Sequence, residues 1–137
     1  MNERSRLITR MARRELAHLA QARRDYAATA RELQAAEALL ARLNLLIDHK
    51  RGQTAAAGSV AALREGRRLN DQLCAEAERN RAKIRDLQRL AQAKAEALAQ
   101  LDHRLRSYDE AAATARKAEG EERDRRAEAN APPRARA

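Results

Sequence analysis

Aromatic residues are almost missing from this chain of 137 residues, which has no tryptophan, no phenylalanine and only two tyrosines, Tyr26 and Tyr108. Globular domains usually build their cores around several aromatic side chains, because each one buries a large apolar area. The apolar residues here are mostly alanine and leucine, and 36% of all residues are charged. This composition is typical of a long helix or coiled coil, or of a disordered chain.

Cysteine and long hydrophobic runs are also scarce. Cys74 is the only cysteine, so no disulfide can form within one chain, which fits a reducing compartment. No apolar run approaches the ~20 residues that span a bilayer. The opening segment MNERSRLITRMARREL lacks the apolar region of a signal peptide. These features predict a cytoplasmic protein without membrane insertion.

Glycine occurs four times and proline twice, so few residues interrupt a helix. Gly52 suits the position just after a helix end, and Ser59 suits the N-cap of a second helix. The prolines stand together near the C-terminus, where a helix cannot continue. The sequence therefore predicts a helical hairpin over residues 1–127 and a disordered tail. Its parts are a helix over 2–51, a turn over 52–59, a helix over 60–126 and a tail over 128–137.

Residues spaced alternately by four and three positions form a ladder along each predicted helix. A disordered chain has no reason to keep this spacing, and a strict seven-residue repeat is the condition for a left-handed coiled coil. Since a short connection makes two long helices antiparallel neighbours, the predicted fold is all-α, a long antiparallel two-helix coiled-coil hairpin with a disordered C-terminal tail. The first ladder is Ile8, Ala12, Glu15, Leu19, Ala22, Tyr26, Thr29, Leu33, Ala36, Leu40, Leu43 and Ile47. The second is Leu63, Gly66, Asn70, Leu73, Ala77, Asn80, Ile84, Leu87, Ala91, Lys94, Leu98, Leu101, Leu105, Tyr108, Ala112 and Ala115.

Polar residues interrupt both ladders, and they are candidates for setting the register of the two helices. Folding the chain about residues 53–57 places Glu15 within one layer of Lys94, and Thr29 within one layer of Asn80. Polar seam residues fix register and orientation at some cost in stability. The alternative is a seam that is weak by design, so that the helices part when a partner binds. The candidate register residues are Glu15, Lys94, Asn70 and Asn80.

The net charge of +9 is unevenly distributed. Residues 109–137 hold seven basic and seven acidic residues, whereas residues 1–51 hold 11 basic and 6 acidic ones. A positive field favours an acidic protein surface, a nucleic acid or an anionic membrane as partner. The second helix is longer than the first, so its end over 109–126 is expected to overhang beside this basic terminus. The candidate partner-binding residues are Arg4, Arg6, Arg10, Arg13 and Arg14.

Side chains that catalyse reactions or hold cofactors are not grouped in this sequence. His18, His49 and His103 are far apart, which disfavours a metal site. No GxxxxGK[ST] or GxGxxG phosphate loop is present, and a two-helix hairpin offers no pocket for a nucleophile and its base. Acidic residues recur among the basic ones, and aromatic stacking platforms are missing, which argues against specific nucleic-acid binding. The chain is therefore predicted to be no enzyme and to bind no cofactor or metal.

Three stretches carry a resemblance to a known family: RELAHLAQARRDYAATARELQAAEALLARLNLL, LREGRRLNDQLCAEAERNRAKIRDLQRL and KAEALAQLDHRLRSYDEAA. Over residues 4–118 the chain resembles the FliJ family of flagellar type III export proteins. The resemblance implies a stalk-like coiled coil that inserts into the export ATPase ring, contacts the export gate and binds export chaperones. It also implies a location in the bacterial cytoplasm, either free or peripheral at the inner membrane. The YscO-type injectisome counterpart is similar.

Two alternatives belong to other classes of protein. One is a generic coiled-coil adaptor or scaffold, such as a homodimer that forms a four-helix bundle. The other is a basic protein that associates with nucleic acid through its net charge alone.

Overall fold

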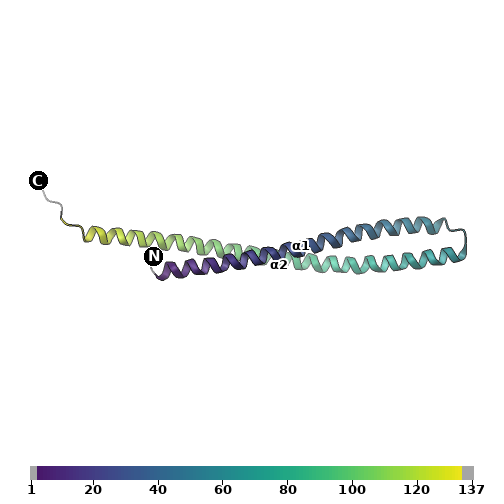
Figure 1. The fold of residues 1–137 in the computed structure, drawn as a ribbon, viewed down its shortest axis with the longest axis horizontal. Coiled ribbons are helices and arrows are strands. Elements are labelled where there is room, and N and C mark those ends of the chain that lie inside the picture. The colour runs from purple at the N-terminus through teal and green to yellow at the C-terminus, as the bar shows by residue number, and fades with distance from the viewer. Residues whose placement is uncertain (1–2, 134–137) are drawn as a thin grey trace. The chain divides into compact units, whose positions relative to one another are not determined.

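The computed structural model describes residues 3–133, which form two helices joined by a short connection. Helix α1 spans Glu3–Ala55 and helix α2 spans Val60–Ala129. The two helices pack against each other in antiparallel orientation, and the described residues form no strand (Figure 1). The prediction of an all-α helical hairpin is confirmed.

The chain divides into two compact units, each containing a stretch of both helices. The turn unit is residues 24–96, which include the connection. The end unit is residues 1–23 and 97–137, of which the structure describes 3–23 and 97–133. Within each unit, the described part of α1 packs on α2.

The predicted ladders are the buried faces of both helices. The turn unit holds two apolar clusters, because leucine and isoleucine dominate its seam. One consists of Ala36, Ile84 and Leu87 with Leu33 and Leu40 against it, and the other of Leu43, Ile47 and Ala77 with Leu40, Leu73 and Cys74 against it. The described part of the end unit has fewer buried apolar residues, which are Leu19 and Ala112, and it also buries Ser5. Most apolar burial therefore stabilises the turn unit.

The connection lies further along the chain than the sequence predicted. Helix α1 continues through Gly52 to Ala55, and no glycine among the described residues has a positive φ. The Thr54 hydroxyl donates to the Lys50 carbonyl oxygen at 2.8 Å, which is a bond within a continuing helix. The prediction that Gly52 ends the helix is therefore wrong. Ser59 does cap α2, since its Oγ accepts a hydrogen bond from the Ala62 amide at 3.1 Å.

The register differs from the predicted one for the same reason. Asn80 Nδ2 donates to the Ala36 carbonyl oxygen at 2.7 Å, so the predicted pairing of Asn80 with Thr29 is wrong. Thr29 instead accepts a hydrogen bond from Lys94 Nζ at 2.7 Å, in place of the predicted layer of Glu15 with Lys94. A seam repeats about every 3.5 residues, so registers several turns apart present the same faces. Only the place of the connection selects among them.

The ends of the helices also differ from prediction. Helix α2 runs to Ala129 rather than to residue 126. Ala112 is buried, so the overhang of α2 does not begin at Asp109; residues 121–129 are all exposed. The described part of the predicted tail contains the last helical residues and Asn130–Pro133, and residues 134–137 lie outside the described part of the chain, as does Asn2.

Replacing Gly52 with alanine tests the course of α1. We expect Gly52→Ala to stabilise the protein by about 0.5–1 kcal/mol, because alanine favours a helix interior and a Cβ at this position meets nothing within 4 Å. Urea unfolding followed by circular dichroism measures the change. Gly66→Ala is the control, because its Cβ would collide with Thr54 Oγ1, so this variant should show a smaller gain in stability or a loss. Destabilisation by Gly52→Ala would contradict a continuous helix.

Candidate protein-binding surfaces

The arginines near the N-terminus form an exposed basic surface on α1 in the end unit. Arg6, Arg10 and Arg13 are spaced by four and three positions, so they lie along one line of the helix. The seam residues Ser5, Ile8 and Ala12 belong to the opposite side. All five predicted partner-binding arginines are exposed, and none makes an ion pair with another described residue: Arg4, Arg6, Arg10, Arg13 and Arg14.

Arginines on α2 have a different environment. Arg79 pairs with Glu76 at 2.6 Å, Arg89 with Asp86 at 2.7 Å, and Arg106 with Asp102 at 2.9 Å. These exposed pairs add little to stability, but each places a negative charge beside the positive one. The five arginines near the start of α1 differ from these three in making no ion pair with another described residue.

Two exposed apolar side chains lie among the α1 arginines. Leu7 is 58% exposed and Met11 is 38% exposed, and they occupy the same face one turn apart. Arg4, Arg10 and Arg14 are three or four positions from one or both of them, so the apolar pair is bordered by positive charge. Leu7 and Met11 belong neither to the seam ladder nor to the predicted partner-binding residues; their signal in the sequence is an apolar pair four positions apart outside the ladder.

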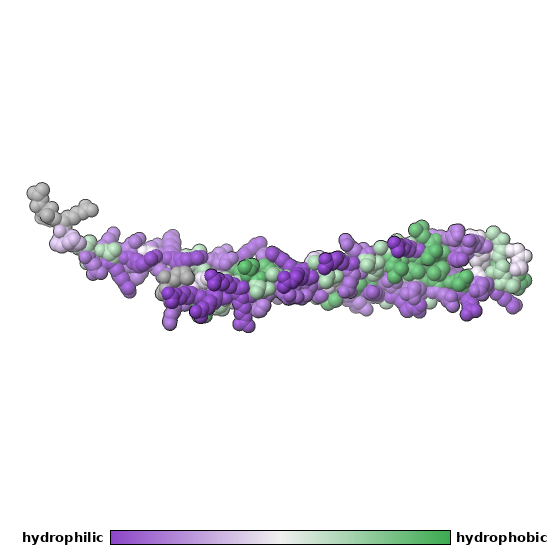
Figure 2. Space-filling view, viewed as in Figure 1, coloured by the Kyte–Doolittle hydropathy of each residue, from purple (hydrophilic) through white to green (hydrophobic). Residues whose placement is uncertain are grey.

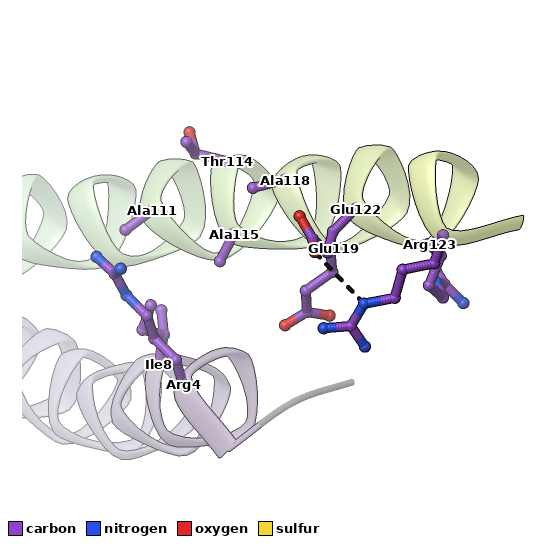
Figure 3. Close-up of a pocket in the computed structure, with 10 residues that line it drawn as sticks. Arg4, Ile8, Ala111, Thr114, Ala115, Ala118, Glu119, Glu122 and Arg123 are labelled. Carbon is purple, nitrogen blue, oxygen red and sulfur yellow. Dashed lines mark ion pairs between the residues drawn. The ribbon is translucent and has the colours of Figure 1, made fainter. Parts of the chain in front are cut away.

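A concavity of about 600 Å³ lies between the start of α1 and the last turns of α2, within the end unit (Figure 3). Arg4 and Ile8 line it from α1. Small side chains line it from α2, where Ala111, Ala115 and Ala118 share one face. Charged residues of α2 close its far side, including the Glu122–Arg126 ion pair at 3.4 Å (Figure 3).

The predicted register residues fall into two groups. Asn80 and Lys94 make hydrogen bonds across the seam of the turn unit, with Lys94 Nζ also 3.4 Å from the Asp25 carbonyl oxygen. Glu15 and Asn70 make no such hydrogen bond, and Glu15 Oε2 and Asn70 Oδ1 are buried without a hydrogen-bond partner among the described residues. A buried polar atom without a partner costs roughly 1–3 kcal/mol. We therefore expect these two residues to weaken the seams in which they lie.

Leucines outside the seam form the main exposed apolar surface of the turn unit. Figure 2 shows hydrophobic residues gathered over this unit, where polar side chains cover less of the surface. The exposed leucines are Leu39, Leu45 and Leu46 on α1 and Leu90 on α2. Single exposed leucines are common on protein surfaces, whereas Leu39 and Leu46, seven positions apart on one face of α1, mark a candidate contact with another protein.

Residues 3–133 contain neither clustered metal ligands nor a helix that could span a membrane. No group of three or more histidine, cysteine, aspartate or glutamate side chains there could hold a metal ion. No helix in that range is long and apolar enough to cross a membrane. Cys74 is half-buried against the apolar cluster of Leu43, Ile47 and Ala77.

No protein-family model, curated protein or solved structure matches this chain.

Proposed function

We propose that this chain is a non-enzymatic coiled-coil protein of the flagellar protein export apparatus that couples the export ATPase ring to the export gate. In this proposal it works in the cytoplasm or at the inner membrane surface, and it also binds export chaperones. The resemblance over residues 4–118 supports this reading, as does an antiparallel helical hairpin of the kind that a stalk requires. An injectisome stalk would need the same architecture.

The single observation that carries the proposal is the basic surface of the end unit. Five exposed arginines occupy the first turns of α1 and have no acidic partner among the described residues. Unpaired arginines contribute little to folding, but they bind carboxylates well when a partner supplies them. A surface of this kind at a helix end fits a protein that docks one end into a larger assembly.

The experiment is a binding and turnover assay with the export ATPase of the same bacterium. We expect the purified full-length protein to bind the ATPase at micromolar concentration and to raise its rate of ATP hydrolysis. A variant that carries Arg6→Glu, Arg10→Glu and Arg13→Glu should lose both effects while keeping its helical circular dichroism. Absence of binding by the unmodified protein would contradict the export function and leave the hairpin unaffected.

A scaffold function is the second candidate, favoured by the exposed leucines Leu39, Leu46 and Leu90. If two copies cover these leucines, the protein should be a dimer by light scattering, and Leu39→Glu should make it a monomer. A monomeric unmodified protein would contradict the scaffold.

A further inference from the structure

We propose that the first turns of α1 form a docking surface for an amphipathic helix of a partner protein, with Leu7 and Met11 as its apolar contacts and the surrounding arginines as its charged border. The inference rests on the proposed function only in its broad form, that the chain binds proteins. It does not depend on which assembly the partner belongs to.

The placement of the side chains supports a helix as the occupant. Leu7, Met11, Arg14 and His18 are spaced by four, three and four positions, which is a second ladder on a different side of α1 from the seam. Its apolar part, Leu7 and Met11, is one turn long and exposed. A partner helix that packs along this line can bury both side chains in the way that one coiled-coil helix receives another.

The arginines beside Leu7 and Met11 predict which charges flank the apolar stripe of the partner helix. Arg10 and Arg14 lie beside the Leu7–Met11 pair, and Arg4 lies at its start. Positive residues beside an apolar seam select acidic residues on the facing helix, as charged flanking positions do in coiled coils. Because Arg4, Arg10 and Arg14 make no ion pair with another described residue, a partner carboxylate replaces water and not an existing ion pair. The partner is therefore a helix with an apolar stripe and glutamate or aspartate along its edge.

A helix explains the surface better than nucleic acid or a membrane. Phosphates would engage the arginines but leave Leu7 and Met11 without a partner. Helices that lie on a membrane carry a wide apolar face with large anchoring side chains, whereas this apolar face consists of two side chains one turn apart.

The test uses the full-length protein and a designed helical peptide of about three heptads, with leucine at the seam positions and glutamate at the flanking ones. A second peptide has lysine in place of glutamate. Vesicles of phosphatidylcholine with phosphatidylglycerol, and a short DNA duplex, are the competing probes. We expect the glutamate peptide to bind and the lysine peptide to fail. Stronger binding to the vesicles or the duplex than to the glutamate peptide would overturn the proposal.

Variants separate this surface from the overall charge. Arg10→Glu with Arg14→Glu should weaken binding of the glutamate peptide by about tenfold or more, because two attractions become repulsions. The matched control changes the charge equally on α2, at the ion-paired and exposed Arg79 and Arg89, and should weaken it by less than about threefold. Equal losses would show that net charge alone attracts the peptide, and would overturn the proposal.

A third variant tests the apolar contacts. Leu7→Ser with Met11→Ser should weaken binding by about fivefold or more, with little effect on stability because both side chains are exposed. An unchanged affinity would overturn the helix-docking surface. Binding of the glutamate peptide without any binding of the export ATPase would keep this surface and contradict the export function, so the two failures are distinguishable.

Discussion

Leu43→Ala is expected to destabilise the protein by about 2–4 kcal/mol, the usual cost of removing a leucine side chain from a packed core. Leu43 is 6% exposed and packs with Ile47 and Ala77 in the turn unit. This cluster has few members, so its neighbours cannot fill the space that the missing atoms leave. Urea unfolding at several protein concentrations measures the loss.

Leu45→Ala is the matched control, because it makes the same substitution two positions along the same helix. Leu45 is 70% exposed, so its loss should change stability by less than about 0.5 kcal/mol. Helix propensity cancels between the two variants, and only burial differs. Equal small losses would show that Leu43 is not in a packed seam. A large loss for Leu45→Ala that depends on protein concentration would show that a second copy covers this face.

Glu15→Leu is expected to stabilise the protein by about 1–3 kcal/mol. Glu15 occupies a seam position of the end unit, and its Oε2 is buried without a hydrogen-bond partner among the described residues. Leucine removes that desolvation cost and adds an apolar contact at a position that coiled coils usually fill with such residues. Thermal unfolding in the presence of urea gives the change, and Glu37→Leu at an exposed position of α1 should give almost none.

The same variant separates the two roles considered for polar seam residues. If Glu15 fixes the orientation of the helices, Glu15→Leu should be more stable and should also form new oligomers, as light scattering would show. If Glu15 instead keeps the seam weak for a partner, the variant should stay monomeric and lose stimulation of the ATPase. No gain in stability would show that Glu15 finds a partner in solution.

The seven-residue spacing correctly predicts which face of each helix is buried. Along the first ladder, Leu19, Ala36, Leu43 and Ile47 are buried, and along the second so are Ala77 and Ile84. Tyr26 is the member at which the pattern was weakest, being 36% exposed. Burial follows from sequence here because a helix has only one period, and side chains spaced by it share a face whatever they pack against.

The basic surface was also predictable in part. The arginines near the N-terminus could be found by counting charges, whereas their lack of ion pairs could not. An arginine on a helix can pair with an acidic residue three or four positions away or with one on the neighbouring helix. Only the packed structure places α2 beside α1 and shows which charges meet.

The sequence by itself determined that the chain forms two helices, which faces they bury and that Ser59 starts the second one. The tertiary structure decided where the first helix ends, which layers meet and which polar atoms remain without partners. Gly52 illustrates this. Glycine destabilises a helix by only about 1 kcal/mol, so the helix-forming residues around Gly52 keep α1 helical to Ala55. The register then follows from the connection, since a seam that repeats every half heptad allows many alignments and the short turn over 56–59 permits few of them.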